Sequence, residues 1–281
     1  MLLFYLEQEQ KKQKQREKAS NHQKNPKGAG RPPKLSLAEE LCLCLFYLRH
    51  APIFRVLGLL FGVSKTTAND IFHRWLDILR ELLPASLYEQ TTKNGENWEK
   101  MAEKLESFCL LIDSTEQGRE RPSDNEEQRK YYSGKKKCHT FKSSVISLPG
   151  GVDFVDVSSG HRGPASDITL YREHQKNKFP GSQPFEGDKG YVGEENIKTP
   201  KKKPKNGELT TQQKAENKTI SSSRIFIEHL IGRMKAFRAL QNRFRLNPNC
   251  YEKVVLAICG LIRLRLRRFR PILNPEKAYL L

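Results

Sequence analysis

Three acidic residues, Asp113, Asp188 and Glu228, stand where the chain is expected to be rigid enough to hold a side chain in place. Asp113 follows five uninterrupted apolar residues at 108–112, a run typical of a strand buried on both faces, and it is expected at the end of that strand, where an α/β protein exposes its chemistry. Asp188 lies between two glycines, which favours a tight turn after a strand. Carboxylate oxygens are the hard ligands that Mg²⁺ takes. We expect the three carboxylates to converge, although Asp113 by itself is better explained as capping the following turn.

Glu228 belongs to a stretch with helical periodicity, residues 224–237. At about 100° per residue, Arg224, Glu228 and Lys235 fall within roughly 40° of one another. The apolar residues fill an arc of about 140° on the other side of this helix; they are Phe226, Ile227, Leu230, Ile231, Met234 and Phe237. The pattern predicts a helix that buries one face and presents a carboxylate between two cations. A surface ladder of ion pairs would have the same pattern.

The elements that position these residues can be predicted in outline. Residues 139–148 and 152–158 indicate two strands joined at Pro149-Gly150-Gly151 as a hairpin, with Asp153 and Asp156 facing outward. Asp167, after Ser166, is expected to cap the start of a helix, and as a fourth carboxylate it is expected to support the other three. Residues 89–104 are polar and are interpreted as a connector.

The N-terminal part of the chain indicates helices throughout residues 35–83. Ser36 and Glu39 form a capping box for a helix to Arg49, and Pro52 begins a second helix. After the turn at Gly62, Ser64 caps a third helix over residues 65–79, which gives helix-turn-helix spacing. An ordinary helical hairpin has the same pattern. If the third helix binds DNA, the side chains that reach bases or phosphates are Lys65, Thr66, Thr67 and Asn69, with His73 and Arg74 farther along.

Composition bounds the function. The chain has 281 residues, a formal charge of +18 and a pI of about 9.7, which favours a polyanionic partner such as double-stranded DNA, although a basic protein without that role would look alike. The six cysteines form no C-x-x-C pair, as expected of reduced cysteines in an intracellular protein. Residues 254–266 are apolar but too short to cross a membrane, so we expect no membrane partner.

Taken together, these motifs resemble a known family. "GRPPKLSLAEELCLCLFYLR", "FGVSKTTANDIFHRW", "LLIDSTEQ", "YYSGKKKCHTFK", "GDKGY" and "RIFIEHLIGRMKAFR" resemble, in this order, the DDE-superfamily transposases of the insertion-sequence-five and PIF/Harbinger type. The last motif resembles the family signature R-x3-E-x6-K, filled by Arg224, Glu228 and Lys235. Ser221 stands where the family often has Tyr, residues 163–167 lack the family's His, and the N-terminus looks shorter than in relatives.

The resemblance implies an α/β fold: an RNase H-like mixed sheet flanked by helices over residues 105–270, preceded by an all-α helix-turn-helix domain over residues 35–88. Residues 1–34 are expected to form a basic, disordered arm. The resemblance also implies that Asp113, Asp188 and Glu228 hold two Mg²⁺ or Mn²⁺ ions, while Arg224 and Lys235 contact DNA phosphates or orient Glu228. Such a protein would act as a homo-oligomer in the cytoplasm, associated with the nucleoid in a bacterium.

Three functions remain open on the sequence. The first is a transposase that binds the ends of its insertion sequence, cuts them and transfers the freed 3′ ends to target DNA. The second is a DNA-binding protein that has lost catalysis, for which the helix-turn-helix and basic helices suffice. The third is an endonuclease of the same fold without strand transfer. Metal binding separates the second from the others, and a product assay separates the first from the third.

Overall fold

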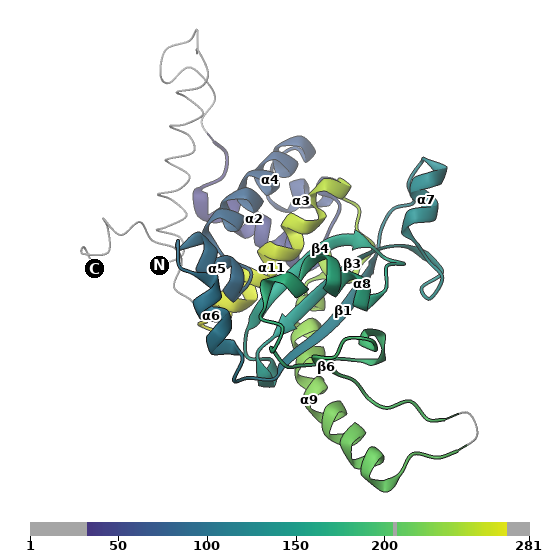
Figure 1. Cartoon of the computed structure of the whole chain (residues 1–281). Coiled ribbons are helices and arrows are strands. Elements are labelled where there is room, and N and C mark those ends of the chain that lie inside the picture. Colours follow the sequence, from purple (N-terminus) through teal and green to yellow (C-terminus); the bar gives the residue numbers. More distant parts are fainter. Residues whose placement is uncertain (1–32, 205–206, 269–281) are drawn as a thin grey trace. The chain divides into compact units, whose positions relative to one another are not determined.

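The computed structural model describes residues 33–204 and 207–268, and these residues form two compact units (Figure 1). The first unit comprises residues 33–83 and the second residues 84–268. The predicted basic arm lies outside the described residues, except for its last two positions. No helix among the described residues is both long enough and apolar enough to span a membrane.

The first unit contains the helices α2 (Leu37–His50), α3 (Phe54–Leu60) and α4 (Lys65–Leu82). The capping box of Ser36 and Glu39 is present as predicted, and Ser64 caps α4 through the backbone N–H of Thr67. Helix α3 begins at Phe54 rather than Pro52, because Ile53 keeps an extended backbone with ψ of 146°. Apolar side chains of all three helices form one core, in which Leu48, Leu57 and Trp75 are fully buried.

The second unit is built on one mixed sheet. Strands β3 (Cys138–Ser147) and β4 (Phe154–Arg162) form the predicted hairpin, and β3 pairs antiparallel with β1 (Leu110–Gly118). On its other side β1 pairs parallel with the short β5 (Phe185–Glu186), which pairs parallel with β6 (Ile197–Lys198). Strand β2 (Tyr132–Ser133) pairs with the start of β3. Three antiparallel strands followed by two parallel to the first are the RNase H-like arrangement, so the α/β prediction is confirmed.

Helices cover both faces of this sheet (Figure 1). One face forms a core from Leu110, Ile112, Tyr171, Phe185 and their buried neighbours. On the other face lie α9 (Thr211–Lys235) and α11 (Tyr251–Arg265), whose buried residues include Leu230 and Ile258. The remaining elements are α5 (Leu87–Lys93), α6 (Trp98–Leu105), α7 (Asn125–Tyr131), η1 (Pro149–Gly151), α8 (Asp167–His174), η2 (Lys176–Lys178), η3 (Lys189–Tyr191), α10 (Arg238–Gln241) and η4 (Pro248–Cys250).

Strand β1 does not end at Asp113, as the apolar run suggested, but continues to Gly118. The continuation is possible because β3 supplies a hydrogen-bonding partner along the whole strand, from Leu111 to Gly118. On the opposite side, β5 pairs only with Leu110 and Leu111. Asp113 therefore lies where its parallel neighbour ends, and the exposed strand end at this point belongs to β5.

The interpretation of residues 89–104 as a connector is wrong, because these residues lie largely in α5 and α6. Both helices are short and mostly polar, and only a few apolar side chains in this region pack against the sheet. Leu105 belongs to the core of the sheet, and Leu87, Trp98 and Met101 are partly buried against it. The indole Nε1 of Trp98 also donates a hydrogen bond to the backbone oxygen of Lys178. Burial of these few large side chains holds α5 and α6 against the core of the sheet.

The prediction that Asp153 and Asp156 face outward is also wrong, since both are buried. Asp153 accepts two hydrogen bonds from Arg263 of α11, at 2.7 and 3.0 Å, and the Arg263 side chain is fully buried. Asp156 accepts hydrogen bonds from Lys178 and Gln175, each at 3.0 Å. The error arises because the start of β4 is covered on both faces, so that the consecutive residues Phe154, Val155 and Asp156 are all buried. A buried carboxylate then requires a buried partner.

Candidate active site and nucleic-acid interface

Asp113 lies in the middle of β1 with a partly buried side chain. Its Oδ1 accepts a hydrogen bond from the backbone N–H of Ser114 at 2.8 Å, which fixes the carboxylate against its own strand. The pKa of Asp113 is raised to about 6, chiefly by burial and to a lesser extent by the nearby carboxylates of Asp188 and Asp167, against the lowering effects of the Ser114 hydrogen bond and of Arg224. A carboxyl so perturbed in the middle of a rigid sheet is a candidate for function.

Asp188 follows β5 directly and caps the short helix η3, where its Oδ1 accepts a hydrogen bond from the backbone N–H of Gly190 at 2.7 Å. The flanking glycines allow close packing. A Cβ at Gly187 would lie 2.8 Å from the Tyr191 ring and 3.0 Å from Ile112 of β1. A glycine at 187 is therefore what brings the Asp188 loop against β1.

Gly190 separates two carboxylates. A Cβ at this position would lie 2.8 Å from Oδ1 of Asp188 and 2.5 Å from Oδ2 of Asp167, so these two oxygens are at most 5.3 Å apart. Any larger residue would push the carboxylates away from each other. The absence of a side chain at position 190 thus concentrates negative charge at this edge of the sheet.

Asp167 is the first residue of α8, and the N-cap is Ser166 rather than Asp167, because the Ser166 side chain accepts a hydrogen bond from the backbone N–H of Thr169; the prediction that Asp167 caps this helix is wrong. Its Oδ1 accepts a hydrogen bond from Oγ of Ser114 and forms an ion pair with Nζ of Lys142 at 2.9 Å. Sequence analysis missed both partners. The available signal was a lysine within the otherwise uncharged part of a strand, residues 140–148, which becomes conspicuous only once that strand is known to be central.

Glu228 and Asp113 lie on either side of the Arg224 guanidinium. The Arg224 Nη2 lies 3.8 Å from Oδ2 of Asp113 and 3.7 Å from Oε1 of Glu228, so these two carboxylate oxygens are at most 7.5 Å apart. The side chain of Glu228 is 55% exposed, whereas those of Arg224 and Asp113 are 17% and 18% exposed. Glu228 therefore points away from the apolar core and towards the face of Asp113.

Helix α9 contains both Arg224 and Glu228. It is continuous over 25 residues and is capped by Thr210. Its buried face comprises Ile227, Leu230, Ile231 and Met234, as predicted, but Phe226 is 47% exposed. The hairpin turn packs against the Phe226 backbone, since a Cβ on Gly151 would lie 2.4 Å from the Phe226 carbonyl oxygen. Lys235 is exposed at the end of α9, and desolvation and Lys136 lower its pKa while Asp113 raises it.

The donor chemistry of this site suits a hard divalent cation. Asp113 and Asp188 are carboxylates held by backbone hydrogen bonds, and the pKa of Asp113 is raised chiefly by its burial, with a smaller contribution from the carboxylates of Asp188 and Asp167. In the part of the chain that the structure describes, no three His, Cys, Asp or Glu side chains are arranged as a metal-binding group. The Arg224 guanidinium, which contacts both Asp113 and Glu228, stands where a bridging cation would be needed.

The first unit presents the turn and exposed helix start that the helix-turn-helix pattern predicted. Gly62 has a φ of +66°, and a Cβ at Gly58 would lie 2.6 Å from the Val63 carbonyl oxygen, so both glycines are needed for the tight turn between α3 and α4. Lys65, Thr66 and Thr67 are exposed at the start of α4, although Thr67 Oγ1 also shares a hydrogen bond with Ser64. Asn69 is half-buried one turn later.

His73 and Arg74, the other two predicted DNA contacts, are engaged inside the first unit. The His73 ring packs against Phe54 and Phe72. Arg74 Nη2 forms an ion pair at 2.7 Å with Glu40, a buried carboxylate that also accepts a hydrogen bond from Trp75. The His73 contacts join α4 to α3, and the contacts of Glu40 with Arg74 and Trp75 join α4 to α2, so both predicted DNA contacts take part in the packing of the first unit.

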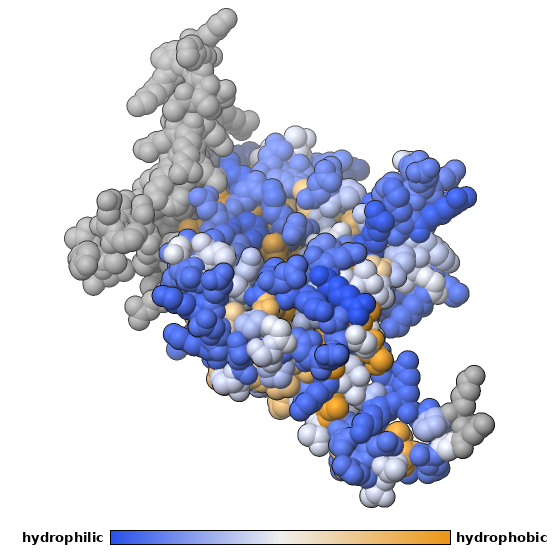
Figure 2. All heavy atoms as spheres, in the orientation of Figure 1, coloured by the Kyte–Doolittle hydropathy of each residue, from blue (hydrophilic) through white to orange (hydrophobic). Residues whose placement is uncertain are grey.

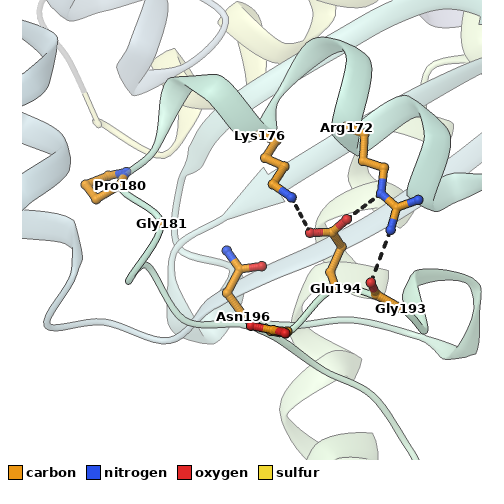
Figure 3. Close-up of a pocket in the computed structure, with 8 residues that line it drawn as sticks. Arg172, Lys176, Pro180, Gly181, Gly193, Glu194 and Asn196 are labelled. Carbon is orange, nitrogen blue, oxygen red and sulfur yellow. Dashed lines mark hydrogen bonds and ion pairs between the residues drawn. The ribbon is translucent and has the colours of Figure 1, made fainter.

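A hollow of the second unit, about 540 Å³, lies at the other end of α8 from Asp167 (Figure 3). Glu194 is held there by Lys176 at 2.8 Å and by Arg172, whose Nη2 also donates to the Gly193 carbonyl at 3.1 Å. Burial would raise the pKa of Glu194, but the hydrogen bonds from Lys176 and Arg172 lower it overall. Because the two cations are bound to this carboxylate, the cluster is a structural link between α8 and residues 193–196.

Comparison with known proteins agrees with this architecture. The family described as "DDE superfamily endonuclease" matches residues 112–263, more than half of the chain, and "Helix-turn-helix of DDE superfamily endonuclease" matches residues 33–85. The chain therefore belongs to the DDE superfamily of endonucleases, with the helix-turn-helix that accompanies it. It is 28% identical over 227 residues to the "Probable transposase for insertion sequence element IS702" of Microchaete diplosiphon, covering 79% of this chain and 78% of that protein.

Solved structures give weaker similarities. The chain is 15% identical to the mariner Mos1 paired end complex with Mg, with a TM-score of 0.23 and coverage of 92% of this chain and 85% of that one. It is 13% identical to the Mos1 transposase paired-end complex with the left transposon end, with a TM-score of 0.20 and coverage of 88% and 85%. Because these scores are low, the fold assignment rests on the strand order and the family.

The prediction of a DDE transposase with a DNA-binding helix-turn-helix is thus confirmed by the family matches and the IS702 relative. The finer assignment to the insertion-sequence-five or PIF/Harbinger type stays a prediction. So do the roles of the individual site residues.

Proposed function

We propose that the chain binds the ends of its insertion sequence through α4, cuts them and joins the freed 3′ ends to target DNA. Asp113, Asp188 and Glu228 would hold Mg²⁺ or Mn²⁺ for this reaction. One observation supports the proposal above all others. The pKa of Asp113 is raised to about 6 by burial and by neighbouring carboxylates, at the edge where Asp188 and the Glu228 face of α9 meet β1.

The chemistry explains why carboxylates are needed here. When bound, two such ions would activate the attacking oxygen and stabilise the leaving 3′ oxygen of an in-line displacement. The protein's part is to hold the ligands: the strand fixes Asp113, and the turn at Gly190 fixes Asp188. Arg224 must release Glu228 for it to act as a ligand, and a DNA phosphate beside α9 would accept the freed guanidinium. Lys235, exposed at the end of α9, would contact another phosphate.

The proposal divides DNA binding between the two units. The start of α4 would read the element's ends, while exposed Lys201, Lys202 and Lys203 of the second unit would bind any DNA backbone. Changing Thr67 or Asn69 to Ala should relax the preference for the element's ends. Changing the three lysines should weaken binding to all DNA and reduce its salt dependence. Equal effects from both sets would show that this division is wrong.

The test of catalysis is a supercoiled-plasmid assay with the element's ends, run beside a gel shift. The parent chain should cut with Mg²⁺ or Mn²⁺, and Asp188→Asn should abolish cutting while it leaves DNA binding intact. Glu173→Gln, which changes an exposed carboxylate of α8, is the matched control and should cut normally. Ca²⁺ should support binding without efficient cutting. Cutting by Asp188→Asn, or in chelator, would contradict the proposal.

The same assay separates the alternative functions. A parent chain that binds the ends but never cuts would be a DNA-binding protein without catalysis. Cut products without joined ends would indicate an endonuclease that lacks strand transfer. Joining two ends at once also requires more than one active site, so we propose a homo-oligomer on DNA, which the mass of the chain–DNA complex would establish.

A further inference from the structure

Three elements of the catalytic unit meet at the side chain of Asp167. Asp167 itself begins α8, Ser114 lies on β1 next to Asp113, and Lys142 lies on β3. The Asp167 Oδ1 receives both the Ser114 hydroxyl and the Lys142 ammonium, the latter at 2.9 Å. Lys142 also donates to the Ala165 carbonyl oxygen at 2.7 Å. One oxygen of Asp167 is thereby anchored to both neighbouring strands.

Lys142 is unusual among the cations of this basic chain because it is only 7% exposed. A buried ammonium is costly unless it is paired and hydrogen-bonded. Both of its described acceptors, Asp167 and Ala165, come from the segment that begins α8. Lys142 therefore does not face solvent as a DNA-binding lysine would. It fixes the start of α8 to the sheet.

The other oxygen of Asp167 faces the Asp188 loop. Oδ2 lies so close to Gly190 that a Cβ there would be 2.5 Å away, with Asp188 on the other side of the same residue. Asp167 thus packs directly against Gly190, whose N–H holds the Asp188 carboxylate. Asp167 also contributes negative charge next to Asp113 and so increases the demand for a cation at this site.

We propose that Lys142 and Asp167 form a positioning pair for the catalytic carboxylates, and that this pair sets the metal affinity of the site. The inference rests on the proposed function, because it assumes that Asp113 and Asp188 hold a divalent ion. Lys142 holds Asp167, Ser114 completes the contact to β1, and Asp167 holds the Gly190 turn that orients Asp188. In metal sites, partners that orient the ligands typically change affinity by about 10- to 100-fold when removed.

The sign of one substitution distinguishes this role from direct ligation. If Asp167 were itself a metal ligand, Lys142→Met would free its carboxylate and tighten metal binding or leave it unchanged. If Asp167 is a positioning residue, Lys142→Met loosens it and weakens metal binding. The measurement is isothermal titration of the full chain with Mn²⁺, without DNA, so that it does not depend on cleavage.

Four variants are compared with the parent chain: Lys142→Met, Asp167→Asn, their combination and Asp188→Asn. Lys142→Met and Asp167→Asn should each weaken Mn²⁺ binding about tenfold or more. The double variant should bind Mn²⁺ as tightly as whichever single variant has the lower affinity, because both substitutions act through one contact. Asp188→Asn should lose the most. Lys130→Met, which changes an exposed lysine of α7, is the matched control and should bind as the parent does.

Folding is monitored by thermal unfolding of each variant. Should Lys142→Met fail to fold, Lys142→Arg, which keeps the charge, and Ser114→Ala, which removes only one hydrogen bond to Asp167, take its place. Lys142→Arg should keep most of the Mn²⁺ affinity of the parent chain, and Ser114→Ala should lose part of it.

Unchanged or tighter Mn²⁺ binding by Lys142→Met, or by Ser114→Ala in its place, would overturn the inference. So would a loss in Asp167→Asn as large as that in Asp188→Asn. If Asp188→Asn itself binds Mn²⁺ normally, the proposed function fails instead.

Discussion

Two arginines of the catalytic unit face carboxylates of the sheet in opposite ways. Arg263 on α11 binds Asp153 through two hydrogen bonds of 2.7 and 3.0 Å and also donates to Pro84, Ser86 and Gln90. Arg224 on α9 only approaches its carboxylates, at 3.8 Å from Asp113 and 3.7 Å from Glu228. Its Nε is buried and has no hydrogen-bond partner among the described residues.

The difference separates an arginine with a structural role from one that can still bind a ligand. Arg263 is fully buried with its donors satisfied, so it links α11, the start of β4 and the start of α5 as a fixed part of the structure. Arg224 retains unused hydrogen-bonding capacity beside a carboxylate whose pKa is raised. Unsatisfied capacity of this kind indicates a site that is completed by a ligand.

The largest expected effect comes from breaking the satisfied pair. Arg263→Met leaves the Asp153 carboxylate buried without its cation, and we expect a loss of about 3–5 kcal/mol in the free energy of unfolding. Urea denaturation followed by circular dichroism measures it. The exposed Arg243, which lies 3.6 Å from Glu120, provides the control Arg243→Met, which should change stability by less than about 0.5 kcal/mol. Equal losses in the two variants would refute the assigned difference.

At Asp113, in contrast, removing the charge should increase the stability of the protein. The folded-state pKa of Asp113, about 6, exceeds the ordinary value of 3.8, so its charged form is disfavoured in the native protein. Its contribution to stability is therefore present at low pH and is lost as the pH rises through about 6. Asp113→Asn should stabilise the metal-free chain at pH 8, by on the order of 3 kcal/mol at most. Asp153→Asn should destabilise it, and a loss of stability in both variants would remove the contrast.

Metal binding should follow the same titration. Because a metal ligand must be deprotonated, protonation of Asp113 competes with Mn²⁺ below pH 6. The affinity for Mn²⁺ should be nearly constant from pH 7 to 8 and fall by about tenfold per pH unit below 6. Titration calorimetry from pH 5 to 8 measures this dependence. An affinity that is unchanged between pH 5 and 7 would exclude Asp113 as a ligand.

The smallest effect concerns Arg224 itself. Arg224→Gln removes a cation with weak contacts, so stability should change by less than about 1 kcal/mol. At pH 8, Mn²⁺ binding should tighten, by up to about fivefold, because a competing cation has gone. DNA binding should weaken, since a phosphate contact is lost. Calorimetry and gel shifts of the same variant measure both, and weaker Mn²⁺ binding would show that Arg224 supports the metal site rather than competing for it.

Local patterns in the sequence determined much of this protein. The apolar run before Asp113 predicted the central strand, and the periodicity around Glu228 predicted most of the buried face of α9. Ser36 and Ser64 marked two helix starts correctly, because N-capping depends on residues within one turn. The glycine at 62 likewise predicted the turn of the helix-turn-helix. Hydrophilic side chains cover most of the visible surface of α7 and of the part of α9 farthest from the sheet, as the basic composition implies (Figure 2).

What the tertiary structure alone decided are the contacts between residues far apart in the chain. Asp153 and Asp156 looked like exposed residues until Arg263 and Lys178 were found beside them. Strand β1 continues past Asp113 because β3 pairs with it, and nothing in residues 114–118 announces that partner. Lys142 acquires a role only through Asp167, 25 residues later, when two strands and a helix meet. Burial and charge compensation depend on the whole fold, so residue type and local spacing cannot predict them.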